Sequence, residues 1–216
     1  MPFPRPGKKT SATDHAIAVT RNAKSLAKGF AATNDSARDL WESVSIQGIP
    51  VAPLPAAHTG ITLKREFHTL DGKPADLAKL KQNDRLVVTL QGATADVRHH
   101  QIAVLDLLPA GFEIEGAVKA DKDGKTAYPW LGALRALRLT EARDDRFVAS
   151  FVVHPDEASI FVDDPKKEEL PTYLIAYVVR AITPGTYVLP AAVASDMYRP
   201  MIKARTAMGA VTIQAR

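Results

Sequence analysis

Apolar and polar positions alternate most clearly between residues 172 and 200, and this stretch sets the expectation for the rest of the chain. One face of a predicted strand carries Tyr173, Ile175, Tyr177 and Val179. The other face carries Leu174, Ala176 and Val178. Because both faces are apolar, the pattern predicts a strand that is covered on both sides. Pro184 and Gly185 favour a tight turn, after which residues 187–189 predict a second strand that ends at Pro190.

Shorter alternating runs predict further strands along the chain. Their ranges are residues 61–68, 86–90, 101–108, 112–115, 147–153 and 210–214. Turn signals at residues 71–72 and 121–124 separate some of them. One helix is predicted over residues 130–140, because Trp130, Leu134 and Leu137 have helical spacing and Pro129 suits a first helical turn.

The region before Pro50 shows weaker strand signals. Residues 1–14 contain three prolines and are predicted to be a disordered or extended arm. Short strands are expected at residues 17–19, 30–33 and 40–49, followed by a linker over residues 51–60. Two or three such strands bury little core of their own. We therefore expect a partial β-domain of orphan strands over residues 15–52, with an edge that needs outside strands.

Strands at short, regular spacing with turns between them are typical of a β-sandwich. The βαβ alternation that builds a parallel sheet does not occur in the sequence. The predicted fold class is therefore all-β: an antiparallel β-sandwich over residues 53–216 with one short helix, preceded by the partial β-domain.

Composition excludes several function classes. The chain has no cysteine, which excludes disulfides, thiolate metal sites and a cysteine nucleophile. The net charge is only +4, and no basic block of the kind that binds nucleic acid occurs, so no nucleic-acid partner is expected. No apolar run is long enough to cross a membrane, and the first residues lack the apolar core of a signal peptide.

Candidate metal sites are weak. The Asp121-x-Asp123-Gly124 run resembles the start of a calcium loop, but the position that needs a bidentate glutamate is Gly132, so a loop tip is the better interpretation. His99 and His100 are adjacent on a predicted strand and point to opposite faces, so they are expected at a surface strand end. No metal site and no cofactor are expected.

The candidate catalytic groups also lack the neighbouring residues that catalysis needs. The carboxylate pairs at residues 144–145 and 163–164 are neighbours on predicted loops, whereas acid–base catalysis needs opposed carboxylates with separated pKa values. No serine lies in a Gly-x-Ser-x-Gly elbow, and no glycine-rich phosphate loop follows a strand. No catalytic residue is assigned, and the chain is not expected to be an enzyme.

Met197, Tyr198 and Arg199 form the most informative surface candidate. They follow Asp196, precede Pro200 and are expected on a loop, with residue types that are enriched in binding interfaces. The alternative is a Tyr198 that plugs one end of the sandwich and bonds the backbone. We assign the three residues as a candidate interdomain contact, and both interpretations stay open at this point.

Ordered motifs link the chain to a known family. The strand pair Tyr-Leu-x-Ala-Tyr-x-x-Arg-Ala-x-Thr-Pro-Gly-Thr-Tyr and the segment Asp196-Met197-Tyr198-Arg199-Pro200 resemble the C-terminal end of bacterial alpha-2-macroglobulins. Upstream segments at residues 63–67, 70–74, 82–88, 106–115 and 141–149 fit the same template in order. The resemblance covers the chain from about Ala27 onward. It implies a last macroglobulin-like (immunoglobulin-like) sandwich, preceded by the end of the domain before it.

The resemblance also implies a function. Members of this family are periplasmic or cell-envelope inhibitors that trap peptidases, and some react through a thioester that needs a Cys-x-x-Gln arrangement. This chain has no cysteine, so it would not inhibit alone. Its expected partners are the other domains of the same inhibitor, above all the thioester domain, and peptidases only indirectly. The alternative from another class is a free-standing adhesion or carbohydrate-binding module that uses exposed aromatics such as Trp130 or Tyr198.

Overall fold

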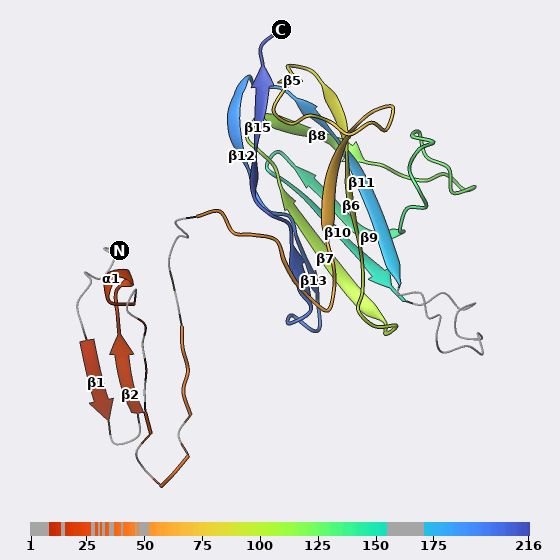
Figure 1. The fold of residues 1–216 in the computed structure, drawn as a ribbon. Coiled ribbons are helices and arrows are strands. Elements are labelled where there is room, and N and C mark those ends of the chain that lie inside the picture. Colours follow the sequence, from red (N-terminus) through yellow and green to blue (C-terminus); the bar gives the residue numbers. More distant parts are fainter. Residues whose placement is uncertain are drawn as a thin grey trace. The chain divides into compact units, whose positions relative to one another are not determined.

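The computed structural model describes residues 9–13, 16–26, 29, 31, 33–34, 37–39, 41–45, 47, 52–154 and 171–216 (Figure 1). The chain divides into two compact units, Met1–Gly48 and Ile49–Arg216. Each unit is described by itself. The expected loop over residues 155–171 and its Asp163–Asp164 pair lie, apart from Pro171, outside the described residues.

The first unit contains a two-stranded antiparallel sheet. Strand β1 (Lys9–Thr13) pairs with β2 (Ala16–Thr20), and the short helix α1 (Ala23–Leu26) follows. The strand predicted around residues 17–19 is confirmed as part of β2. Of the two forms expected for the first residues, disordered or extended, Lys9–Thr13 take the extended one, because these residues gain backbone partners from β2.

Two other strands predicted in this unit were wrong for the residues that are described. Residues 31, 33, 41–45 and 47 belong to no strand. Trp41 is 99% exposed and Val44 is 69% exposed, so neither side chain is buried in the described structure. Isolated strands without a packed face are marginal in water, and alternation alone was therefore an insufficient signal here.

The second unit is built almost entirely of strands. They are β3 (Ala57–Thr59), β4 (Lys64–Thr69), β5 (Leu80–Lys81), β6 (Arg85–Ala93), β7 (His100–Leu107), β8 (Phe112–Ala117), β9 (Leu137–Arg143), β10 (Arg146–Val153), β11 (Thr172–Ala181), β12 (Gly185–Leu189), β13 (Val193–Asp196), β14 (Lys203–Arg205) and β15 (Gly209–Gln214). Six of them form one sheet in the order β3-β14-β13-β7-β10-β9, and four form another in the order β4-β6-β11-β8. A three-stranded sheet, β12-β15-β5, contains the one parallel pairing among the described strands, between β15 and β5. The prediction of an antiparallel β-sandwich is confirmed.

The core lies between the six-stranded and four-stranded sheets. The alternating face of β10 supplies Phe147, Ala149, Phe151 and Val153, which are all fully buried. Aromatic rings from the two sheets meet there: the Phe147 and Tyr177 rings stack with centroids 4.3 Å apart, and Phe151 lies 5.0 Å from Tyr173. Burial of each large side chain contributes about 1.5–3 kcal/mol relative to exposure.

Strand β11 is buried on both faces, as its pattern predicted. Tyr173, Ile175, Tyr177 and Val179 belong to the core between the sheets. Ala176 and Val178 lie on the opposite face in a second apolar cluster with Val87 and Val118. Side chains from the segment between β8 and β9 cover this second cluster, namely Tyr128, Trp130, Leu131 and Leu134.

The helix predicted over residues 130–140 does not form. Residues 129–131 make a turn, residues 132–136 are irregular, and Leu137 begins strand β9. The apolar spacing had another cause: Trp130, Leu131 and Leu134 cover the outer face of the four-stranded sheet, and Arg135 N–H donates to the Leu174 carbonyl of β11 at 2.8 Å. The indole N–H of Trp130 donates to Leu70 O, and Gly72, at φ +89°, leaves the space that the indole ring fills. Tertiary contacts therefore override the local helical pattern.

A charged cluster is buried between the two sheets. Arg65 of β4 pairs with Asp106 of β7, and their side chains are 4% and 1% exposed. Tyr177 O–H of β11 donates to Asp106 Oδ2 at 2.6 Å, and Arg65 also donates to Pro190 O at 2.7 Å. Burial raises the pKa of the Asp106 carboxyl, although the Arg65 charge and the Tyr177 hydrogen bond act in the opposite direction. The cluster joins one sheet to the other by directional contacts.

Candidate interdomain contact site

The predicted contact residues lie on a loop at one end of the six-stranded sheet. This 197–202 loop connects β13 to β14, whose pairing (Val193↔Arg205 to Ser195↔Lys203) brings the two ends of the loop together. Met197 is 57% exposed, Tyr198 is 74% exposed and Met201 is 73% exposed. The alternative of a Tyr198 that plugs the sandwich is therefore wrong, because most of its surface faces solvent.

Asp196 builds the start of this loop. Its Oδ1 accepts the backbone N–H groups of Tyr198 at 2.9 Å and Arg199 at 3.0 Å. Asp196 is only 1% exposed, and its own N–H donates to Ile202 O at 3.0 Å. A carboxylate that caps the N–H groups two and three residues onward is a turn device typical of aspartate. The loop backbone is thus held at both ends, while the side chains of Met197, Tyr198 and Met201 are exposed.

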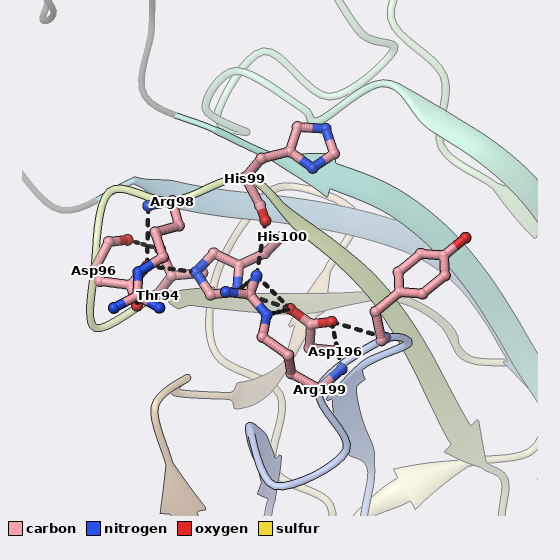
Figure 2. A network of polar contacts seen from close by, with 8 residues as sticks. Thr94, Asp96, Arg98, His99, His100, Asp196 and Arg199 are labelled. Carbon is pink, nitrogen blue, oxygen red and sulfur yellow. Dashed lines mark hydrogen bonds and ion pairs between the residues drawn. The ribbon is translucent and has the colours of Figure 1, made fainter.

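Arg199 is the one predicted contact residue that turns back toward the protein. Its guanidinium contacts Asp196 Oδ2 at 2.9 Å and donates to His99 O at 2.7 Å. Figure 2 shows Arg199 beside Asp196 and His100, with His99 projecting away from the cluster. The structure therefore separates the three residues: Met197 and Tyr198 form the exposed surface, and Arg199 holds the loop in place.

His100 lies at the centre of this cluster. Its Nδ1 is 2.9 Å from Asp196 Oδ2, and its Nε2 is 2.7 Å from Asp96 Oδ1. The prediction of a surface strand end is right for His99, which is exposed, and wrong for His100, which is 0% exposed. The two histidines point to opposite faces, as the strand period requires, and the inward face at this position carries carboxylates rather than apolar side chains.

The hydrogen bonds keep both carboxylates ionised to low pH. For Asp196, burial acts to raise the pKa, but the Tyr198 and Arg199 backbone N–H groups, His100 and the Arg199 charge together lower it. For Asp96, burial again acts to raise the pKa, while the Arg98 N–H and His100 lower it below its ordinary value. Since charged partners strengthen a hydrogen bond about twofold, the ionised state is the one that holds the loop.

Sequence reasoning missed several members of this site. Met201 was not assigned, and neither were the residues that hold the loop, Asp96, His100 and Asp196. The Asp-x-Tyr-Arg spacing was a usable signal, since an aspartate two and three residues before free N–H groups favours a turn. Asp96 precedes β7 and His100 begins it, whereas Asp196 ends β13. Only the pairing of β13 with β7 brings Asp96 and His100 to Asp196.

The Asp121–Gly124 run and the Asp144–Asp145 pair lie on exposed turns, as expected. Asp121–Gly124 forms an exposed loop tip in which Asp121 accepts N–H groups from Asp123 and Lys125. Asp144 and Asp145 occupy the exposed turn between β9 and β10. Among the residues that the structure describes, no group of three or more His, Cys, Asp or Glu side chains is placed to hold a metal ion. Within the same residues, no helix has the length and apolar character of a membrane span.

Trp130 does not form an exposed aromatic platform. Its ring lies 4.9 Å from His68 and 6.4 Å from Tyr128, within the side chains that cover the second apolar cluster. The expectation that Trp130 is exposed is therefore wrong. Tyr198 is the exposed member of the pair of aromatics that the carbohydrate-binding alternative would use.

Comparison with known proteins identifies relatives across most of the chain. The family model for the bacterial alpha-2-macroglobulin MG10 domain matches residues 60–200. An alpha-2-macroglobulin of Escherichia coli K12 is 31% identical over 181 residues, covering 80% of this chain and 10% of that protein. An alpha-2-macroglobulin of Xylella fastidiosa strain 9a5c is 29% identical over 213 residues, covering 94% of this chain and 12% of that protein.

Solved structures agree. Native alpha-2-macroglobulin from E. coli, spanning domain MG7 to the C-terminus, aligns with a TM-score of 0.61 and 27% identity over 77% of this chain and 25% of that one. Salmonella alpha-2-macroglobulin reacted with methylamine aligns with a TM-score of 0.60 and 26% identity over 77% of this chain and 10% of that one. The chain thus spans about a tenth of the length of the full relatives it matches. With a matching family model over most of its second unit and the sandwich fold to accompany it, this chain belongs to the bacterial alpha-2-macroglobulin family and carries its MG10 domain.

Proposed function

We propose that this chain is the C-terminal structural module of an alpha-2-macroglobulin-like peptidase inhibitor, and that it packs against and shields the thioester domain through the 197–202 loop. Met197 and Tyr198 are the contact residues. The single observation that supports this proposal is a loop whose backbone is fixed by buried polar groups while the side chains of Met197, Tyr198 and Met201 stay in solvent. Exposed aromatic and methionine side chains on a pre-organised backbone bind at low entropic cost.

The chain acts only together with the rest of the inhibitor. It has no cysteine, so it cannot supply the thioester itself. The similarity to a Salmonella protein that has been reacted with methylamine, and to E. coli proteins activated by trypsin and by porcine elastase, supports a peptidase-linked role. Its partners are the remaining domains of the same protein, peptidases are indirect partners, and its location is the periplasm or cell envelope.

The test combines this chain with the thioester-bearing part of its parent protein. Association is measured by calorimetry, and the rate of methylamine incorporation into the thioester is measured with and without this chain. We expect binding and a slower reaction with methylamine for the wild-type chain, and weaker protection for Tyr198→Ala. The matched control is Val188→Ala on β12, which is 61% exposed and outside the loop. No binding, or equal protection by both variants, would contradict the proposal.

A further inference from the structure

The polar groups beneath the 197–202 loop form a continuous chain. Thr94 Oγ1 donates to Asp96 O at 2.8 Å, and Asp96 Oδ1 lies 2.7 Å from His100 Nε2. His100 Nδ1 then lies 2.9 Å from Asp196 Oδ2, and Asp196 Oδ1 accepts the loop N–H groups. This series of polar contacts runs from the segment between β6 and β7 to the loop between β13 and β14 (Figure 2).

The two oxygens of Asp196 have separate tasks. Oδ1 builds the turn by accepting from Tyr198 and Arg199. Oδ2 receives His100 at 2.9 Å and the Arg199 Nε at 3.1 Å. A carboxylate rotates broadly about its terminal torsion, so contacts to Oδ2 decide where Oδ1 points. Arg199 belongs to the loop itself, whereas His100 belongs to β7. His100 is therefore the residue that fixes the loop relative to the sheet.

The position of His100 is itself fixed. Its ring is 0% exposed, and Asp96, which holds Nε2, also accepts the Arg98 N–H at 2.9 Å. The segment that carries Asp96 is tied to its surroundings by Thr94 N–H to Pro171 O at 3.1 Å and by Ala95 N–H to Gly60 O at 2.9 Å. Both ring nitrogens therefore lie within hydrogen-bond distance of a carboxylate, Nδ1 of Asp196 and Nε2 of Asp96. Arg199 Nη2, 3.0 Å from Nδ1, converges on the same Asp196 oxygen.

We propose that His100 is the positioning residue of the 197–202 loop, that its Nδ1 contact with Asp196 sets the direction in which Met197 and Tyr198 project, and that Asp96 anchors it. The effect on contact with a thioester domain rests on the function proposed above, whereas the effect on the loop itself does not. Since a net hydrogen bond contributes about 0.5–1.5 kcal/mol, losing the Nδ1 contact should open the loop up to about tenfold more often.

Matched substitutions separate positioning from space filling. His100→Asn keeps a donor where Nδ1 stands and loses the reach to Asp96. His100→Gln keeps a donor where Nε2 stands and loses the contact with Asp196. His100→Phe keeps a ring of similar size and loses both polar contacts. If His100 only filled the space around its ring, Phe would be the best replacement and Asn the worst. A positioning role predicts the opposite order, with Asn closest to wild type.

The readout is native-state hydrogen exchange at the Tyr198 and Arg199 amides, normalised to the buried Ile175 amide of β11 so that changes in global stability cancel. We expect exchange within about threefold of wild type for His100→Asn, and about tenfold faster exchange for His100→Gln and His100→Phe. His58→Gln, on the exposed strand β3, serves as the control and should leave both amides unchanged.

Two results would overturn the proposal: wild-type exchange in His100→Phe or His100→Gln, or exchange at the two amides that only follows the exchange of Ile175. Calorimetric titration with the thioester-bearing part then tests the consequence, with binding by His100→Gln expected to be weaker and binding by His100→Asn expected to be close to wild type. If exchange follows the predicted order while no variant changes association, the positioning role stands and the proposed interdomain function is the part that fails.

Discussion

Two polar clusters in the second unit each pair an arginine with an aspartate, but in different places. Arg65, Asp106 and Tyr177 lie between the two sheets, and the Asp106 residue is 0% exposed. His100, Asp196 and Arg199 lie at the end of the six-stranded sheet, where the Arg199 side chain keeps 33% of its exposure. The first cluster joins sheet to sheet, and the second joins a strand to a loop. The comparison teaches that the location of an ion pair, rather than its composition, decides whether it stabilises the fold or shapes a surface.

The largest effect is expected in the cluster between the sheets. Arg65→Met leaves the Asp106 carboxylate without its cation in a buried site, which should cost about 3–5 kcal/mol of unfolding free energy. The triple variant Arg65→Met, Asp106→Leu, Tyr177→Phe removes every polar group of the cluster together and should be more stable than the single variant. Chemical denaturation measures both. A single variant that unfolds at the wild-type denaturant concentration would remove the distinction between the clusters.

A smaller and more local effect is expected at the loop. Asp196→Ala removes the acceptor for two loop N–H groups and leaves His100 facing Asp96 alone, at a cost of about 1–3 kcal/mol. The Tyr198 and Arg199 amides should lose their exchange protection, while the β11 amides keep theirs relative to global unfolding. Exchange followed by NMR provides the measurement. Uniform loss of protection across both sheets would show that this cluster also acts on the whole fold.

Acid pH should act on the two clusters with opposite sign. The pKa values of Asp96 and Asp196 are lowered from 3.8 in the folded state, so their contribution is present above that value and is lost as the pH falls through the folded pKa. The raised pKa of Asp106 contributes stability at low pH that is lost as the pH rises through its folded value. Denaturation between pH 2 and pH 6 should therefore show a shallower acid loss for Asp196→Asn than for wild type. An equal slope would contradict the assignment.

The smallest effect on stability is expected at the tip of the loop. Tyr198 is 74% exposed and its side chain has no hydrogen-bond partner among the described contacts, so Tyr198→Ala should change the unfolding free energy by less than about 0.5 kcal/mol. Thermal and chemical denaturation test this expectation. A loss above about 1 kcal/mol would mean that the ring supports the sandwich after all, and the loop would then be part of the fold.

The sequence predicted the sandwich well because long strands carry a strong signal. The two apolar faces of β11 and the strict alternation of β10 identified a strand buried on both sides and a strand of the core. Such patterns reflect burial directly, since side chains alternate between the two faces of a strand. The order of the motifs also identified the family, which the match over residues 60–200 confirms.

Short strands and the 130–140 segment could not be predicted in the same way. β3 consists of Ala57–Thr59 within the expected linker and exists because it pairs with β14, a partner about 145 residues away in sequence. Trp130 and Leu134 are apolar because they cover a second apolar cluster, and not because they lie on one face of a helix. In each case the deciding partner is distant along the chain, and local pattern carries no information about it.

The loop shows the same division between local and distant information. Its place and the exposed side chains of Met197 and Tyr198 follow from a local signal, an aspartate before a polar turn. The role of His100 does not, because Asp96 and Asp196 reach it from separate loops that only the folded sheet brings together. Residue type predicted what the loop presents, and only the fold shows how the loop is held.

The proposed association of this chain with a thioester domain tests the central claim most directly. Calorimetric titration of wild type, Tyr198→Ala and Val188→Ala should give saturable binding for the wild type and the Val188 variant. Binding by Tyr198→Ala should be at least about tenfold weaker, as expected when a central interface aromatic is truncated. Equal affinity for all three chains, or no binding by any of them, would contradict the view that this loop is where the module meets its neighbour.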